Sequence, residues 1–334
     1  MTKLETTYLG LKLKNPIIIS SSGLTNTPEK NLALENAGAG AIVLKSLFEE
    51  QIMMHSSQLL EHSNYTEALD YIKNYVHSHN LNDYIELVKG SKRLCSIPII
   101  ASINCYKSGD WATFAHQIEL AGADAIELNL FLLSTNKQDD SNTSEQVYIE
   151  IVQSVKNVVS IPIVVKIGSQ FTNLIAFSER LIAAGANSIV LFNRFYQPEI
   201  DLTKMEIKQG EAFSSPSEFS NTLRWTALIS GLVKHSNVVS STGIHHSENA
   251  IKALLVGAEA VQICSTIYKN GNKIIGEIIE QMEKWMNEQG YYSISEFKAK
   301  LNYANSENPT LFERAQFMKY YADSDKHNGE IYFT

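Results

Sequence analysis

Two lysines directly follow strongly apolar runs of the chain. Lys45 comes after 41–44, and Lys166 comes after 163–165. The ammonium group must reach water at the end of its run or meet a partner, because burying an unpaired charge is costly. A lysine held in this way can act as a Schiff-base nucleophile or as a fixed positive charge facing a developing anion. The residues alone leave both chemistries open.

Two asparagines, Asn129 and Asn193, also follow apolar runs. A side-chain amide both donates and accepts hydrogen bonds, which suits the amide edges of a heterocycle. No histidine pair or carboxylate cluster accompanies them at a metal-ligand spacing, so metal-dependent hydrolysis is poorly supported. His245-His246 is interpreted as a solvated or helix-capping pair.

The elements that position these residues are marked by two recurring phrases. In the first phrase, a glycine ends a helical pattern by taking the left-handed conformation, and a short apolar run follows. This phrase recurs at 37–42, 121–126, 184–189 and 256–261. In the second, proline opens an apolar run, where it forfeits no essential ladder bond, and a related phrase has valine in place of the proline. The proline phrase recurs at 15–17, 97–99 and 161–163, and the related phrase is 237–239.

Together the phrases predict eight short strands that alternate with helices. The strands are expected near 17–21, 41–44, 99–103, 125–128, 163–167, 188–191, 238–241 and 260–263. Runs that are apolar on both faces are typical of buried parallel strands, and eight β and α units predict a (β/α)8 TIM barrel. A doubly wound open sheet is the alternative, but the G-x-G-x-x-G turn that usually accompanies it is absent.

The predicted barrel occupies 1–303, and a C-terminal extension, 304–334, packs on the barrel or at an oligomer interface. Two long segments, 47–89 and 195–219, follow the second and sixth strands. Both are therefore expected over the C-terminal face of the barrel, where barrel enzymes place their sites.

Polar residues close each predicted strand and form a ring at that face. The ring comprises 20–23, 45–46, 102–104, 127–129, Lys166, 193–194, 240–243 and 264–266. Within it, Thr242-Gly243 and Ser265-Thr266 follow strands 7 and 8, where small residues commonly let backbone N–H groups approach a phosphate. Ordinary helix capping by Ser and Thr is the alternative interpretation.

Composition excludes several classes of protein. There are 28 Lys and Arg against 36 Asp and Glu, a net charge of −8, without a basic run that would favour nucleic acid. No segment approaches the ~18 apolar residues of a membrane helix, and the N-terminus lacks a signal core, so a cytoplasmic protein is expected. Three cysteines without a C-x-x-C pattern suggest neither a disulfide framework nor an iron–sulfur or zinc site.

In combination and in order, these motifs closely resemble those of the dihydroorotate dehydrogenase family, from about residue 4 to 300. The motifs are Asn15-Pro16-Ile17, Ser21-Ser22-Gly23, 40–46, Glu127-Leu128-Asn129, Val165-Lys166 and Thr242-Gly243-Ile244. The resemblance implies a flavin-dependent (β/α)8 barrel that oxidises dihydroorotate to orotate in pyrimidine biosynthesis, with FMN as cofactor.

The resemblance also implies roles for individual residues. Ser21, Ser22 and Gly23 match the stretch beside the flavin ring, and Lys45 with Ser46 matches the pair at the ring and the substrate. Asn129 and Asn193 match asparagines around both, and Asn104 is placed with the cofactor-binding residues. Lys166 matches the lysine near flavin N1–C2=O, where a fixed cation stabilises the negative charge that hydride transfer creates. The FMN phosphate loops correspond to Thr242, Gly243, Ser265 and Thr266.

Two departures from the family concern the substrate. After E-L-N the family carries S-C-P-N, or Ser in place of Cys, and that side chain removes the substrate proton. Leu132 takes this position in an ungapped alignment, whereas a loop longer by two residues makes Ser134 the base and Asn136 its substrate-binding companion.

The second departure is that the family's M-G-x-x-N segment has no counterpart in the excursion 47–89. A relative acting on another cyclic dihydro-amide and a flavin-binding paralogue without turnover therefore remain alternatives, with a Schiff-base aldolase more distant.

The resemblance bounds the partners as well. The quinone-linked branch carries an N-terminal hydrophobic extension, whereas this chain begins almost directly at strand 1. A soluble electron acceptor is implied, and a homodimer is expected because the soluble branches are often dimeric or paired with an iron–sulfur subunit. Phe312, Phe317, Tyr320 and Tyr321 in the extension could pack on the barrel or at an oligomer surface.

Overall fold

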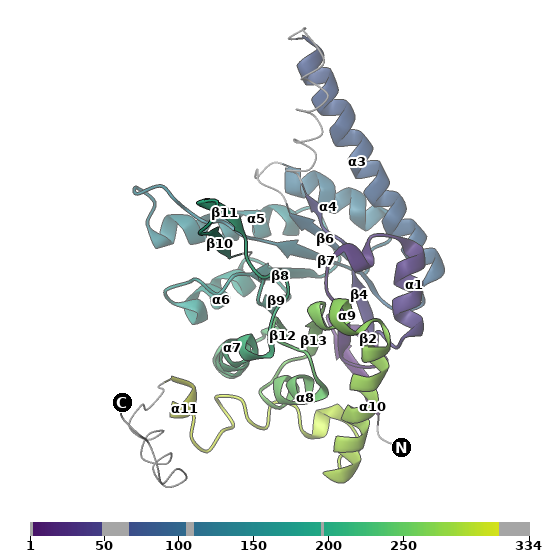
Figure 1. Cartoon of the computed structure of the whole chain (residues 1–334), viewed down its shortest axis with the longest axis vertical. Helices are drawn as coiled ribbons and strands as arrows, with labels where there is room; N and C mark the ends of the chain where they lie inside the picture. Colours follow the sequence, from purple (N-terminus) through teal and green to yellow (C-terminus); the bar gives the residue numbers. More distant parts are fainter. Residues whose placement is uncertain (1–2, 49–66, 105–109, 195–196, 314–334) are drawn as a thin grey trace.

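The computed structural model describes residues 3–48, 67–104, 110–194 and 197–313. Eight parallel strands form a closed barrel, and helices surround it (Figure 1). The barrel strands are β3 (Ile17–Ile19), β4 (Ala41–Val43), β6 (Ile99–Asn104), β7 (Ala125–Asn129), β8 (Ile163–Ile167), β9 (Ser188–Leu191), β12 (Asn237–Ser241) and β13 (Ala260–Ile263). The pairing of β4 with β6 closes the ring, with Ile42 opposite Ile99. The predicted (β/α)8 barrel and its strand positions are confirmed.

Helices follow the strands in the order expected for a barrel. They are α1 (Pro28–Asn36), α3 (Glu67–Leu94), α4 (Asp110–Leu120), α5 (Ser141–Lys156), α6 (Leu174–Ala183), α7 (Phe219–Leu232), α8 (Ser247–Leu255), α9 (Ser265–Asn270) and α10 (Lys273–Glu288). The glycine phrases end helices as predicted. Gly185, for example, follows α6 with φ +114°, a left-handed conformation that an L side chain would strain.

Two layers of side chains fill the barrel. The lower layer is apolar and contains Ile18, Ile100, Ala125, Val164, Val239 and Ala260. Because side chains in a strand alternate between faces, the next inward-facing residue lies two positions further along. Those residues are the buried polar side chains Ser20, Ser102, Glu127, Lys166, Ser241 and Gln262. The change from apolar to polar therefore occurs inside the barrel, at the end where the strands finish.

A hairpin that the sequence analysis did not anticipate precedes the first barrel strand. Its strands are β1 (Thr6–Tyr8) and β2 (Leu11–Leu13), which pair antiparallel. Tyr8 is buried with the lower layer, and its hydroxyl donates to Ser188 Oγ at 3.0 Å, at the start of β9. The hairpin thus packs against the N-terminal end of the barrel, opposite the polar layer.

The two long segments add elements at the other end of the barrel. The first contains β5 (Leu47–Phe48) and α3, a 28-residue helix that extends well beyond the barrel (Figure 1). The second forms a hairpin of β10 (Pro198–Asp201) and β11 (Glu206–Gln209), followed by the 3-10 turn η2 (Pro216–Glu218). The middle of the first segment, 49–66, lies outside the described residues.

After α10 the chain continues through the 3-10 turn η3 (Ile294–Glu296) to α11 (Thr310–Glu313). Backbone hydrogen bonds from Leu301 to Leu255 and from Tyr303 to Ala227 tie this stretch to the barrel helices. Phe317, Tyr320 and Tyr321 lie outside the described residues, so the division at residue 303 stays a prediction. In the part of the chain that the structure covers, no helix has both the length and the apolar character needed to cross a membrane.

Candidate active site

A cavity of about 170 Å³ opens where five barrel strands end, and we call it the site cavity. Its lining combines residues that follow β3, β8, β9, β12 and β13. Of the predicted site residues, Ser21, Lys166, Asn193, Thr242, Gly243 and Ser265 line it. The fold thus brings together residues up to 244 positions apart in the chain, from Ser21 to Ser265.

Lys166 projects from β8 into the polar layer of the barrel. Its Nζ donates to Ser20 Oγ at 2.9 Å and to Gln262 Oε1 at 2.8 Å. The carboxylate of Glu127 lies 4.0 Å away, and both charged side chains are almost fully buried. An ammonium group held by two acceptors and a counter-charge favours the fixed-cation role over that of a Schiff-base nucleophile.

The two predicted asparagines meet beside Lys166. Asn193 Nδ2 donates to Asn129 Oδ1 at 2.8 Å, and Asn129 is the neighbour of Lys166 in the register of β7 and β8. Among the described residues, the Asn193 carbonyl oxygen and the Asn129 amino group have no other side-chain hydrogen bond, so both can serve a ligand. The pair can therefore present one acceptor and one donor, as the sequence predicted for a heterocycle.

A chain of serine hydroxyls continues the ring past β3 and β4. Ser21 Oγ lies 3.0 Å from Ser46 Oγ, which lies 2.7 Å from Ser102 Oγ. Tyr84 of α3 holds the backbone of Ser102, because its hydroxyl donates to the Ser102 carbonyl oxygen at 2.9 Å and accepts from the Ser102 backbone N–H at 2.7 Å. Lys45 is half-buried at the edge of this chain, and its backbone N–H donates to Thr25 O at 3.2 Å.

The loops after β12 and β13 form the other side of the site cavity. Thr242 and Gly243 have φ values of +77° and +79°, so two successive residues adopt the left-handed conformation. Among the described residues, none accepts a hydrogen bond from the backbone N–H groups of Gly243 and Ile244. Such a turn offers donors to an anion. Thr266 differs: it is buried, and its hydroxyl donates to His245 O at 3.1 Å.

Residues from the segment after β11 close over this side of the site cavity. Ser214 is held by its backbone N–H, which donates to Ser265 Oγ at 3.0 Å, and by its hydroxyl, 3.0 Å from His245 Nε2. Arg194 also lines the site cavity, and its Nε pairs with Glu218 at 3.0 Å. Ser214 and Gln262 were not among the predicted site residues. A glutamine inside the apolar run 260–263 was the available signal for Gln262.

Ser22, Gly23 and Asn104 do not line the site cavity. Ser22 caps the 3-10 turn η1 (Gly23–Thr25), with its Oγ accepting from the Leu24 N–H at 3.2 Å. Gly23 is exposed, and a Cβ there would lie 2.9 Å from the Tyr268 hydroxyl. Asn104 is half-buried at the end of β6 and adjoins 105–109, which lie outside the described residues.

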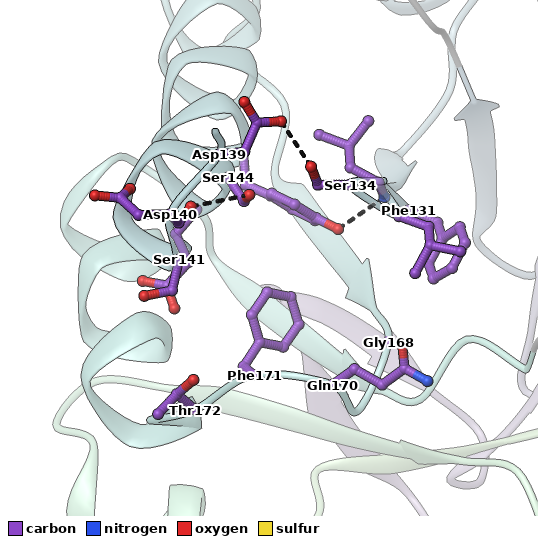
Figure 2. A pocket seen from close by; sticks show the side chains of 14 residues that line it. Phe131, Ser134, Asp139, Asp140, Ser141, Ser144, Gly168, Gln170, Phe171 and Thr172 are labelled. Atoms are coloured by element: carbon purple, nitrogen blue, oxygen red, sulfur yellow. Dashed lines mark hydrogen bonds between the residues drawn. The ribbon is translucent and has the colours of Figure 1, made fainter. Parts of the chain in front are cut away.

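Ser134 lines a second cavity, of about 270 Å³, between the loops after β7 and β8, whereas Asn136 does not line it. Figure 2 shows the Ser134 hydroxyl directed at Asp139, to which it donates at 2.6 Å, with Phe171 across the cavity. Asn136 Nδ2 donates to the other oxygen of Asp139 at 2.9 Å. Leu132 is held by its N–H, which donates to the Tyr148 hydroxyl at 2.9 Å.

A third cavity, of about 560 Å³, links these two regions. Phe131 and Leu133 line it on one side, and Asn193, Arg194 and Thr242 on the other. The first two residues also line the cavity beside Ser134, and the last three also line the site cavity. The C-terminal face of the barrel therefore carries adjoining hollows, with Lys166 and Ser134 in different ones.

Comparisons with known proteins agree with this architecture. Residues 3–286 match the model of the family described as dihydroorotate dehydrogenase. The catalytic subunit of dihydroorotate dehydrogenase B (NAD(+)) from Thermoplasma acidophilum is 25% identical over 302 residues, 89% of this chain and 98% of that protein. The protein of the same name from Pyrococcus abyssi is 28% identical over 300 residues, 88% of this chain and 97% of its own length. The resemblance seen in the motifs is confirmed: the chain belongs to the dihydroorotate dehydrogenase family.

Proposed function

We propose that this protein is an FMN-dependent dehydrogenase that oxidises (S)-dihydroorotate to orotate. The observation that carries the proposal is the site cavity, where the buried Lys166 and Asn193, which donates to Asn129, lie with a left-handed turn that has available backbone donors. The family match over most of the chain and the relatives named dihydroorotate dehydrogenase B support the same substrate. The reaction acts on a CH–CH bond, which loses a hydride and a proton.

The donor set fits FMN. Gly243 and Ile244 present backbone N–H groups for the phosphate, together with Ser265 at the next strand end. Lys166 would hold the N1–C2=O edge of the ring, and Asn129 and Asn193 would contact the ring and the substrate. Bound FMN would supply an acceptor for the hydride at N5. A fixed ammonium group at the opposite edge of the ring favours hydride arrival, and such preorganised groups contribute ~3 kcal/mol in comparable sites.

The proton requires a base, and we keep Ser134 as the candidate. Its hydroxyl already donates to Asp139 at 2.6 Å, so a carboxylate stands ready to take the hydroxyl proton when Ser134 accepts one from the substrate. Because Ser134 lines the cavity next to Phe131 and Leu133, the loop 131–139 must bring it toward Asn193 when the substrate binds.

Ser134→Ala tests this assignment. We expect the rate of flavin reduction by dihydroorotate to fall by about 10²-fold or more, as for loss of a general base, with FMN still bound. Ser144→Ala is the matched control, because Ser144 lines the same cavity but donates to the Asp140 backbone oxygen. Equal reduction rates in the Ser134→Ala variant and the wild type would remove Ser134 from the mechanism.

The relatives are named as catalytic subunits, which implies a partner subunit in those proteins. For this chain we propose a soluble electron acceptor, a cytoplasmic location and a homodimer.

The visible spectrum of the purified protein tests the proposal as a whole. We expect flavin absorbance, or its recovery when FMN is added, and bleaching on anaerobic mixing with dihydroorotate. A colourless protein that does not bind FMN would overturn the cofactor assignment. Bound flavin that dihydroorotate does not bleach, but another cyclic dihydro-amide does, would assign the chain to a relative with a different substrate.

A further inference from the structure

Behind Lys166, three buried polar side chains from different strands form one connected group. Glu127 comes from β7, Gln262 from β13 and Ser20 from the end of β3. Gln262 Nε2 donates to Glu127 Oε2 at 2.5 Å, and Gln262 Oε1 accepts from Lys166 Nζ at 2.8 Å and from Ser20 Oγ at 3.1 Å. The amide of Gln262 therefore stands between a carboxylate and an ammonium group.

Only one orientation of this amide satisfies both neighbours. A lysine ammonium can only donate and an ionised carboxylate can only accept, so the Gln262 oxygen must face Lys166 and its nitrogen must face Glu127. A leucine at this position would leave Glu127 Oε2 without its donor. A glutamate would place a second carboxylate beside the first. A glutamine at position 262 therefore suits a site between Lys166 and Glu127, because it accepts from one and donates to the other.

The separation leaves Glu127 incompletely neutralised. Its Oε1 lies 4.0 Å from Lys166 Nζ, whereas a charge-assisted hydrogen bond would bring the atoms to about 2.8 Å. Oε1 is buried and has no hydrogen-bond partner among the described residues. Removing a carboxylate from water without full pairing is costly, so a structural role alone would favour direct contact with the lysine.

The same arrangement keeps Lys166 available to the site cavity. Its ammonium group has three N–H donors, and Ser20 and Gln262 take two. Lys166 also lines the site cavity, so the remaining donor can serve a ligand there. Direct contact with Glu127 would occupy that donor and draw the ammonium group away from the cavity.

We propose that Glu127 and Gln262 are positioning residues that set the reduction potential of the bound flavin through Lys166. Gln262 holds the ammonium group toward the site cavity, and Glu127 places a negative charge behind it that partly cancels its field. Because two-electron reduction adds negative charge to a flavin, Lys166 stabilises the reduced state and Glu127 opposes that effect. The inference rests on the proposed FMN site and concerns how this chain tunes it.

The midpoint potential of bound FMN tests the proposal, since a merely structural role would change stability without a defined direction of potential. Glu127→Gln keeps the shape of the side chain and removes its charge, so we expect the potential to rise. The preference for reduced over oxidised FMN should increase on the order of tenfold. Lys166→Met should shift the potential in the opposite direction. Glu145→Gln is the matched control, because Glu145 pairs with Arg180 on the outer helices.

A potential for Glu127→Gln equal to that of Glu145→Gln would overturn the inference while leaving the flavin site intact. If Glu127→Gln does not fold, the midpoint potential of FMN bound to Lys166→Met is compared with that of the double variant Glu127→Gln/Lys166→Met. In the double variant neither charge is buried. The proposal requires the higher potential in the double variant. A wild-type protein that binds no FMN would instead overturn the proposed function, and the inference with it.

Discussion

His245 is buried beside the closing segment of the site cavity, with its Nε2 3.0 Å from Ser214 Oγ. Burial is the main cause that lowers the pKa of His245 below 6.5, and the nearby positive charge of Lys269 acts in the same direction. The folded protein therefore holds His245 neutral at pH values where the unfolded chain binds a proton. Stability from this residue is fully present above about pH 6.5 and is lost as the pH falls toward the folded pKa.

We expect wild-type stability to drop between pH 7.5 and pH 5.5 by more than that of His245→Asn, since each pKa unit is worth ~1.4 kcal/mol. Urea denaturation at both pH values measures the difference. Identical pH dependence in the wild type and His245→Asn would contradict the prediction.

The sequence predicted Lys166 and the two asparagines as site residues, because each is a polar residue that closes an apolar run. The sequence did not predict that Glu127, Gln262 and Ser20 would group behind Lys166. That grouping exists only because the closed barrel brings β7, β8, β13 and β3 around one axis. Spacing along the chain carries no signal for such contacts, which join residues as far apart as 20 and 262.

Among the elements, the turn after β12 is the one whose conformation the site most depends on. Gly243 has φ +79°, and a Cβ there would lie 2.3 Å from the backbone N of Phe219, at the start of α7. Phe219 N belongs to the main chain and cannot move aside cheaply. A side chain at position 243 must therefore displace α7 or the turn whose N–H groups we propose for the FMN phosphate.

Gly243→Ala should thus reduce both stability and FMN affinity. Gly10→Ala is a close control, because Gly10 has φ +78° and nothing lies within 4 Å of its Cβ position. The control should lose ~1–2 kcal/mol from left-handed strain alone, and Gly243→Ala should lose more. Thermal unfolding with and without FMN separates the effects. Equal losses in the two variants would show that the contact with Phe219 does not matter.

Helices and strands were predicted correctly where a single residue type marks the end of a helix or the start of a strand. Glycines after helices and prolines before strands placed seven of the eight barrel strands, because their backbone constraints are local, and the related phrase 237–239 placed the eighth. The hairpin of β1 and β2 was missed because each strand has three residues, too few for a period to emerge. In the segment 195–219, exposed and mostly polar residues concealed the hairpin of β10 and β11, since no core alternation marks it.

At the scale of the whole molecule, the hairpin of β10 and β11 leaves an apolar face uncovered. Ile200 and Ile207 are cross-strand partners and share one side, while Glu199 and Lys208 share the other. Ile200 is 59% exposed, and Leu202, Met205 and Ile207 are each more than 80% exposed. An apolar patch of this kind on a marginally stable hairpin is typical of an interaction surface. The acidic net charge of the chain favours solubility in general and does not explain this exposed apolar face.

We expect a second copy of the chain to cover this face, as the proposed homodimer requires. Light scattering during size exclusion should give twice the chain mass for the wild type. Ile207→Lys places a charge on the apolar side and should shift the protein to the monomer mass with the flavin site unaltered. Glu199→Lys introduces the same side chain on the opposite side of the hairpin and should leave the dimer intact. A wild-type monomer would contradict the homodimer, and a dimer that persists in Ile207→Lys would place its interface elsewhere.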